Sequence, residues 1–156
     1  GLEKALLDKG FHVRLLDGDV TRKGLCSDLG FSANDREENI RRVAEISKLF
    51  VESGIITINA FITPTERLRK LALNIIGSDN LVSVFVNAPI EVCEARDVKG
   101  MYRKARRGEI SDFTGVSAPF EIPLYPDYEI ETTSKAPEQN IAELLEFIIP
   151  KIKLKA

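Results

Sequence analysis

The sequence predicts an α/β fold in which helices cover both faces of a parallel sheet. Strand-like and helix-like segments alternate along its 156 residues, which is the pattern of parallel sheets. Residues 55–61 form a nearly unbroken apolar run, as in a strand that is buried on both faces. Between residues 35 and 52 the apolar side chains recur at helical spacing. The length fits one domain.

The first half of the chain is expected to contain two helices, each followed by a strand. Leu2, Ala5 and Leu6 lie at helical spacing, so the chain opens within a helix. The expected elements, in order, are a helix that ends at Gly10, a strand at 12–16, a glycine-containing loop that begins with Asp17, a helix from about Asp35 to Glu52 that ends at Gly54, and a strand at 55–61.

The second half continues the same alternation. Pro150 is expected to break the last helix, because proline has no backbone N–H to donate. The expected elements are a helix from Thr65 to Ile76 that stops at Gly77, a strand at 81–86, a short helix from Pro89 to Arg96, a basic segment at 99–115, a strand at 128–132, and a helix from about Pro137 to Ile149.

Composition argues against several classes of function. With 22 basic and 24 acidic residues the net charge is −2, which disfavours a general nucleic-acid binder but permits a local basic site for a phosphorylated small molecule. Cys26 and Cys93 match no disulfide or metal pattern, and His12 stands alone. No apolar run reaches the roughly 18–20 residues of a membrane span. These features favour the cytoplasm, with neither nucleic acid nor membrane as a partner.

Two carboxylates follow the first expected strand. In parallel α/β sheets ligands bind at the carboxyl ends of the strands, which directs attention to residues 17–22, 62–64, 87–89 and 132–135. Asp17 and Asp19 could hold Mg²⁺ through water or accept a proton from an attacking hydroxyl. Asp and Gly are also common turn residues, so a solvated turn is the alternative.

Polar residues at the start of the long helix point toward an anion. Arg36 and Asn39 lie three residues apart and share a face that overlaps the apolar stripe of Ile40 and Val43. Polar groups over an inward stripe should meet a polar partner or face a ligand. Arg22 belongs to the loop before them, and the planar arginine fork suits phosphate or sulfate. An ordinary solvated first turn is the alternative.

The segment after the fourth expected helix is basic and rich in glycine. It can be a solvated helix face, a nucleic-acid contact, or a mobile lid that closes cations over transferring phosphates. The net negative charge and the scarcity of aromatic residues near it disfavour nucleic acid. Its bases are Lys99, Arg103, Lys104, Arg106 and Arg107, and its possible hinges are Gly100, Gly108 and Gly115.

Several sequence blocks together resemble the adenylylsulfate (APS) kinase family. The resemblance covers nearly the whole chain, in order and at matching spacing. The blocks are Asp-Gly-Asp-Val-Thr-Arg-Lys-Gly-Leu at 17–25, Asp-Leu-Gly-Phe-Ser at 28–32, Asp-Arg-Glu-Glu-Asn-Ile-Arg-Arg at 35–42, Phe-Ile-Thr-Pro at 61–64, Ala-Pro-Ile-Glu-Val-Cys-Glu-Ala-Arg-Asp at 88–97, Lys-Gly-Met-Tyr at 99–102, Ala-Arg-Arg-Gly-Glu-Ile at 105–110 and Phe-Thr-Gly at 113–115.

The resemblance implies a P-loop kinase fold, that is, a three-layer parallel sheet with a basic lid. It implies transfer of the γ-phosphoryl group of ATP, with Mg²⁺, to the 3′-hydroxyl of adenosine 5′-phosphosulfate (APS). The product would be PAPS, the activated form of sulfate. The family is usually homodimeric.

The resemblance also implies roles for individual residues. Asp19 would orient or deprotonate the 3′-hydroxyl, Asp17 would support it and meet Mg²⁺ through water, and Lys99 would stabilise charge on the transferred group. The residues implied to bind APS are Asp19, Arg22, Phe31, Arg36, Asn39, Ile62, Lys99 and Phe113, with the two phenylalanines stacked on its adenine. Arg96 and the loop from Thr132 to Lys135 would flank the adenine of ATP. Thr63 occupies the place of a serine sometimes described as phosphorylated.

The chain departs from the family pattern at a few positions. Val20 replaces an asparagine, Lys23 replaces a histidine, and Thr65-Glu66 replaces Tyr-Arg. The 156 residues contain no Gly-x-x-x-x-Gly-Lys-Ser/Thr phosphate loop. We therefore expect residues 1–156 to be a single kinase-like domain without its N-terminal strand and P-loop, about 20–30 residues that would precede Gly1.

Two other functions remain open from the sequence. The same scaffold can phosphorylate a different small anionic acceptor. A domain that has lost its P-loop could instead bind APS or PAPS without catalysis.

Overall fold

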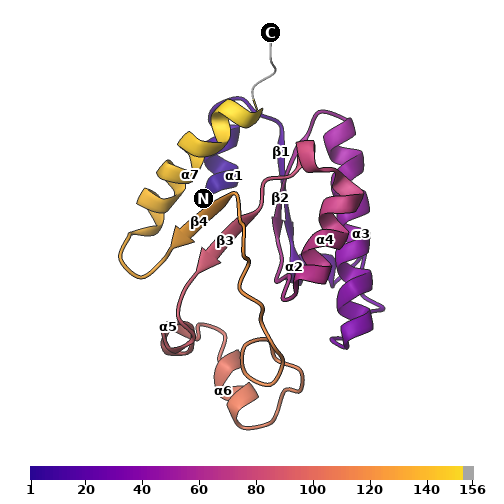
Figure 1. The fold of residues 1–156 in the computed structure, drawn as a ribbon, viewed down its shortest axis with the longest axis vertical. Helices are drawn as coiled ribbons and strands as arrows, with labels where there is room; N and C mark the ends of the chain where they lie inside the picture. The colour runs from indigo at the N-terminus through magenta and orange to yellow at the C-terminus, as the bar shows by residue number, and fades with distance from the viewer. Residues whose placement is uncertain (153–156) are drawn as a thin grey trace.

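The computed structural model describes residues 1–152, which form helices and strands arranged in three layers (Figure 1). Helices α3 and α4 lie on one side of the strands and contact each other, while α1 and α7 pair on the other side. The elements are α1 (Leu2–Leu7), β1 (Val13–Asp17), α2 (Gly18–Thr21), α3 (Ala33–Glu52), β2 (Ile56–Ala60), α4 (Glu66–Ile76), a 3₁₀ turn η1 (Ser78–Asn80), β3 (Val84–Asn87), α5 (Ile90–Arg96), α6 (Met101–Arg106), β4 (Tyr128–Glu131) and α7 (Pro137–Ile152).

The strands are parallel, as predicted, but they form two separate pairs within the described residues. β1 pairs with β2, so that Asp17 lies opposite Ala60, and β3 pairs with β4, so that Asn87 lies opposite Glu131. The prediction that the strand at 55–61 is buried on both faces is wrong. The first three residues of β2 are half-buried, and the last two are exposed. An apolar run in the sequence indicates a strand, but it does not indicate which other strand hydrogen-bonds to it.

Helix α3 is the longest element on the side of the molecule that carries the predicted anion site. Ser32 caps its start by accepting a hydrogen bond from the N–H of Asp35, and Gly54, with φ +76°, closes the turn that follows it. Ser47 joins it to β2, because its hydroxyl donates to the side-chain oxygen of Asn59 at 2.9 Å. Its buried face consists of Asn39, Ile40, Val43, Ala44 and Ser47.

Two predicted boundaries differ from the structure. Residues 18–21 form the short helix α2 instead of a loop, because Asp17 supplies its N-cap. Helix α7 continues past Ile149 and contains Pro150. The missing N–H of a proline removes a single backbone hydrogen bond, which a helix tolerates near its last turn.

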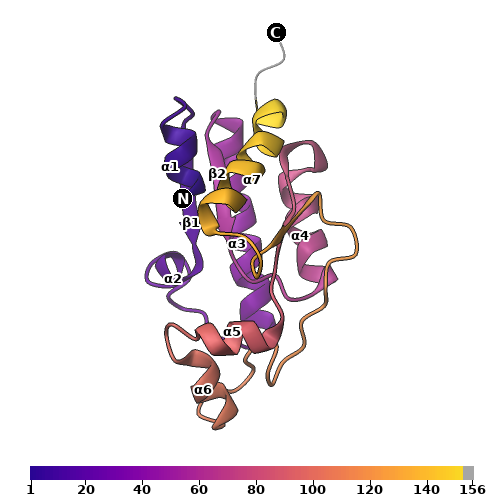
Figure 2. The ribbon, with the colours of Figure 1, turned by 90° about the vertical axis from the view of Figure 1, so that its left-hand side faces the viewer.

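The carboxyl ends of the strands point toward one end of the molecule. Figure 1 and Figure 2 agree that α5 and α6 lie at this end, below the layers formed by the longer helices, while α2 lies beside the lower half of α3. Within residues 1–152, no helix is long and apolar enough to cross a membrane.

Candidate active site

Asp17, the last residue of β1, and Asp19, two residues later, have different tasks. Asp17 Oδ1 accepts hydrogen bonds from the N–H groups of Asp19 at 2.9 Å and Val20 at 3.2 Å, so this carboxylate holds the start of α2. The carboxylate of Asp19 is exposed and forms an ion pair with the ammonium group of Lys99. The hydrogen bond and charge of Lys99 lower the pKa of Asp19, and Asp19 in turn raises the pKa of Lys99. Two residues 80 positions apart thus meet at this end of the sheet.

Two arginines flank the exposed ring of Phe31. The guanidinium carbon of Arg22 lies 4.3 Å from the ring centroid, and that of Arg36 lies 5.7 Å from it. Within residues 1–152, neither guanidinium has a carboxylate at ion-pair distance. Burial and the charge of Arg22 lower the pKa of Arg36. Two like charges held together without an ion-paired carboxylate in the described residues create a site that favours an anion.

Arg36 also connects this corner to the segment that carries Phe113. Its Nε donates to the carbonyl of Phe31 at 3.0 Å, and its Nη2 donates to the carbonyl of Asp112 at 2.7 Å. One guanidinium therefore ties together the backbones beside the two aromatic residues predicted to bind the acceptor base. The ring of Phe113 packs edge-on against Tyr102, with 5.0 Å between centroids.

Asn39 is buried one helical turn after Arg36 and has an unpaired amide. Asn39 is 4% exposed. In the described part of the chain, its Nδ2 is the one buried side-chain nitrogen or oxygen atom that has no hydrogen-bond partner. Leaving such a donor unpaired costs about 1–3 kcal/mol. An acceptor atom supplied by a ligand or by water would recover that free energy.

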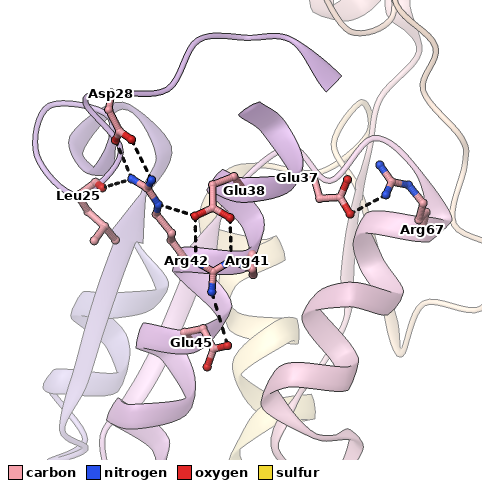
Figure 3. Close-up of polar contacts among 8 residues, drawn as sticks. All are labelled: Leu25, Asp28, Glu37, Glu38, Arg41, Arg42, Glu45 and Arg67. Carbon is pink, nitrogen blue, oxygen red and sulfur yellow. Dashed lines mark hydrogen bonds and ion pairs between the residues drawn. The ribbon is translucent and has the colours of Figure 1, made fainter. Parts of the chain in front are cut away.

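An ion-pair network fixes the loop that carries Arg22 and Phe31 to α3 (Figure 3). Arg42 binds both carboxylate oxygens of Asp28, at 2.6 and 2.8 Å, and also donates to the carbonyl of Leu25 and to Glu38. The hydrogen bonds of Arg41 and then Arg42 lower the pKa of Glu38 to about 2. Bidentate arginine pairs are geometrically specific, so the network sets where the loop lies against α3.

The residues predicted to flank the adenine of ATP are brought together only in part. Arg96 Nη1 donates to the hydroxyl of Thr132 at 3.1 Å, and its Nη2 donates to the carbonyl of the same residue at 2.6 Å. Lys135 instead forms an ion pair with Glu143 of α7 at 2.6 Å, and this pair raises the pKa of Lys135.

Ile62 and Thr63 follow β2 in a loop that begins beside α2, where Phe61 lies against Gly18. The side chain of Ile62 is exposed. The carbonyl of Thr63 accepts a hydrogen bond from Arg69 at 2.9 Å. In residues 1–152 no hydrogen bond or ion pair joins either residue to the other predicted site residues.

Sequence reasoning missed the residues that hold these loops in place. Glu131 accepts hydrogen bonds from the N–H and hydroxyl groups of both Thr133 and Ser134, which folds the turn after β4. The hydroxyls of Ser134 and then Thr133 lower the pKa of Glu131 to about 2. Asp97 caps α6 from within the preceding loop. A carboxylate followed closely by hydroxyl residues or by a helix start is a recognisable signal for both.

Comparison with known proteins decides the family. A family model described as adenylylsulphate kinase matches residues 1–131. The chain belongs to the adenylylsulfate kinase family. The predicted resemblance is therefore confirmed. Family membership also favours an ATP-dependent kinase over the alternative of a binding domain without catalysis.

Individual adenylylsulfate kinases support this membership. A protein of Bacteroides thetaiotaomicron named adenylyl-sulfate kinase is 54% identical over 154 residues, which cover 99% of this chain and 77% of that protein. One of the same name from Shewanella pealeana is 50% identical over 147 residues, covering 94% and 72%. The structure of the Mycobacterium tuberculosis APS kinase CysC in complex with AMPPNP and APS superimposes with a TM-score of 0.90 at 37% identity, covering 95% of this chain and 86% of that one. The predicted P-loop kinase fold is thereby confirmed.

Proposed function

We propose that this protein is an ATP-dependent adenylylsulfate kinase, which transfers the γ-phosphoryl group of ATP to the 3′-hydroxyl of APS to give PAPS. Membership of the family supports the reaction class. The observation that carries the acceptor assignment is the pair of arginines around Phe31 without a carboxylate partner, beside the buried unpaired amide of Asn39. This arrangement fits a ligand that combines an aromatic base with a strong anion.

The acceptor would lie between α3 and the lid, which we define as residues 99–115. Arg22, Arg36 and Asn39 would bind its phosphosulfate group, because they supply unneutralised positive charge and a free donor. Phe31 and Phe113 would pack on its adenine, since aromatic faces stack well on bases. The Arg36 hydrogen bonds to Phe31 and Asp112 support this placement. Ile62, exposed in the loop after β2, would add apolar contact.

Asp19 and Lys99 would act on the transferred group. Phosphoryl transfer through a loose transition state depends mainly on position and charge, so Asp19 can serve as an orienting acceptor for the 3′-hydroxyl even with a lowered pKa. Lys99 would stabilise the charge on the γ-phosphoryl oxygens. Because the two side chains form an ion pair, the 3′-hydroxyl at Asp19 and the γ-phosphoryl group at Lys99 would lie close together.

Arg96 and Thr132 would form the platform for the adenine of ATP. The two hydrogen bonds between them hold the guanidinium plane beside the loop at 132–135, and a guanidinium plane stacks well on a base. Lys135 would border this loop while it remains paired with Glu143.

The carboxylates at the start of α2 fit Mg²⁺ bound through water. Mg²⁺ prefers oxygen ligands and usually keeps several waters alongside one or two carboxylates and the phosphates of the substrate. Asp17 uses Oδ1 for the α2 cap, which leaves Oδ2 to accept from a metal-bound water. When bound, the metal neutralises charge on the phosphates of ATP.

Three further properties follow as proposals from the family resemblance. Thr63 would be a phosphate acceptor, although direct in-line transfer needs no phosphoenzyme. The protein would act as a homodimer, which light scattering coupled to gel filtration tests. It would work in the cytoplasm, because both cysteines are free in the structure and a reducing compartment keeps thiols in that state.

An assay of the intact protein with ATP, Mg²⁺ and APS tests the proposed function. We expect formation of PAPS, and little turnover of small anionic acceptors that lack an adenine. Turnover of another acceptor without any PAPS from APS would contradict the acceptor assignment while leaving the kinase class intact.

A further inference from the structure

Asp97 is a buried carboxylate between α5 and α6 that the proposed mechanism does not use. Its side chain is 8% exposed. Its Oδ1 accepts a hydrogen bond from the N–H of Tyr102 at 3.0 Å, and its Oδ2 accepts one from the N–H of Arg103 at 3.1 Å. The Nε of Arg103 lies 3.6 Å from the same carboxylate.

These two N–H groups are the second and third of α6, which need a cap. The N-cap position itself is Gly100, which has no side chain and a left-handed φ of +67°. Asp97, three residues before Gly100, thus supplies the hydrogen-bond acceptor that an N-cap side chain normally provides. Burial alone would raise the pKa of Asp97, but the N–H groups of Tyr102 and Arg103 outweigh it, so the pKa lies below its usual value. The group is therefore a fixed anion.

Lys99 lies inside the turn that this carboxylate closes. The turn begins at Asp97 and ends at the capped N–H groups, so the backbone of Lys99 is held between two anchored points. At the far end of its side chain, the ammonium group of Lys99 meets Asp19 of α2. Both partners of that ion pair are about two-thirds exposed, and such pairs contribute little by themselves. The position of Lys99 must therefore come from its backbone.

We propose that Asp97 is a positioning residue for phosphoryl transfer, because its carboxylate fixes the turn that presents Lys99 to Asp19 and to the transferred group. The inference rests on the role of Lys99 in the proposed function. A carboxylate that only stabilised α6 would affect catalysis independently of Lys99. One that acts through Lys99 loses its effect when the ammonium group is removed.

A double-mutant cycle in the intact protein separates these two cases. We expect Asp97→Asn to lower kcat for PAPS formation by at least about tenfold, since a misplacement of about 1 Å can cost 10²-fold. The KM for ATP should change by less than about threefold, which is no more than the loss of one neutral hydrogen bond would cause. In a Lys99→Ala background, Asp97→Asn should lower kcat by less than about twofold further.

Amide hydrogen exchange gives a readout that does not depend on activity. The amides of Tyr102 and Arg103 should exchange faster in Asp97→Asn and at the normal rate in Lys99→Ala. Asp79→Asn is the matched control, because Asp79 is an exposed aspartate in η1 and should leave both readouts unchanged.

Several outcomes would overturn the inference. They are an unchanged kcat in Asp97→Asn, a loss of kcat in the double variant equal to the product of the two single losses, or unchanged amide exchange at Tyr102 and Arg103. Failure of the unmodified protein to make PAPS would instead refute the proposed function, so the two failures are distinguishable.

Discussion

The acceptor side and the lid side of the site are built differently. On the acceptor side, α3 runs for 20 residues, buries five of them, and is tied to the preceding loop by Arg42. On the lid side, α5 and α6 have seven and six residues, and Ala105 is the one buried residue within these two helices. Segments with few buried contacts open at low free-energy cost. We therefore expect the proposed acceptor site to be preformed and the lid, which depends on a few side-chain hydrogen bonds, to move.

The largest effect is expected where the two sides meet. Asp19→Asn keeps the shape of the side chain but removes the charge that Lys99 and the 3′-hydroxyl would contact. We expect kcat for PAPS formation to fall by about 10²-fold or more, the usual contribution of such a group. Steady-state kinetics with saturating ATP and APS measure it. Asp8→Asn, which removes a surface partner of Lys4, is the control, and an unchanged kcat in Asp19→Asn would exclude a role for this carboxylate.

The preformed acceptor side should respond through binding. Arg36→Ala removes a half-buried positive charge and the two hydrogen bonds that hold the backbones near Phe31 and Phe113. We expect the dissociation constant of APS to rise by about 1.5–3 kcal/mol, or roughly 10–150-fold. Isothermal titration calorimetry measures this constant, with Arg67→Ala as a control on an exposed arginine. Equal affinities for the unmodified protein and Arg36→Ala would show that the anion binds elsewhere.

The loop at 132–135, which we propose to border the adenine of ATP, should show a smaller and selective effect. Glu131→Gln removes the charge that folds the turn through Thr133 and Ser134. We expect the KM for ATP to rise by roughly 3–10-fold, about 1 kcal/mol, with little change in the affinity for APS. Initial rates at varied ATP test this, and Glu138→Gln, an exposed glutamate at the start of α7, is the control. A parallel loss of APS affinity would mean that the two sides are not independent.

The smallest effect concerns the network that braces the acceptor side. The pKa of Glu38 is lowered from 4.5 to about 2 by its arginines, so its ionised form stabilises the folded state above about pH 4.5. That stabilisation should disappear as the pH falls from 4.5 toward 2. We expect Glu38→Gln to lower Tm slightly at pH 7 and not at pH 2, as measured by calorimetry. A Tm difference that persisted at pH 2 would have another origin.

The sequence predicted the helices and the inward face of α3 better than it predicted the sheet. The stripe of α3 placed Asn39 inward because helical periodicity reports burial directly. Strand pairing could not be obtained in this way, since β2 and β3 look alike as apolar runs but do not hydrogen-bond to each other. The ion pair of Lys135 could not be predicted for a related reason. Its partner Glu143 lies on the next helix, and an ion pair between elements leaves no local pattern.

The buried amide of Asn39 offers the most direct test of the acceptor site. Asn39→Leu has a similar size and removes an unpaired donor, so we expect Tm to rise or stay equal while the dissociation constant of APS increases by at least about tenfold, the value of a lost hydrogen bond to a charged group. Calorimetry of the same sample, with and without APS, measures both quantities. A lower Tm combined with an unchanged affinity for APS would show that Asn39 is structural and that the acceptor does not bind at this corner.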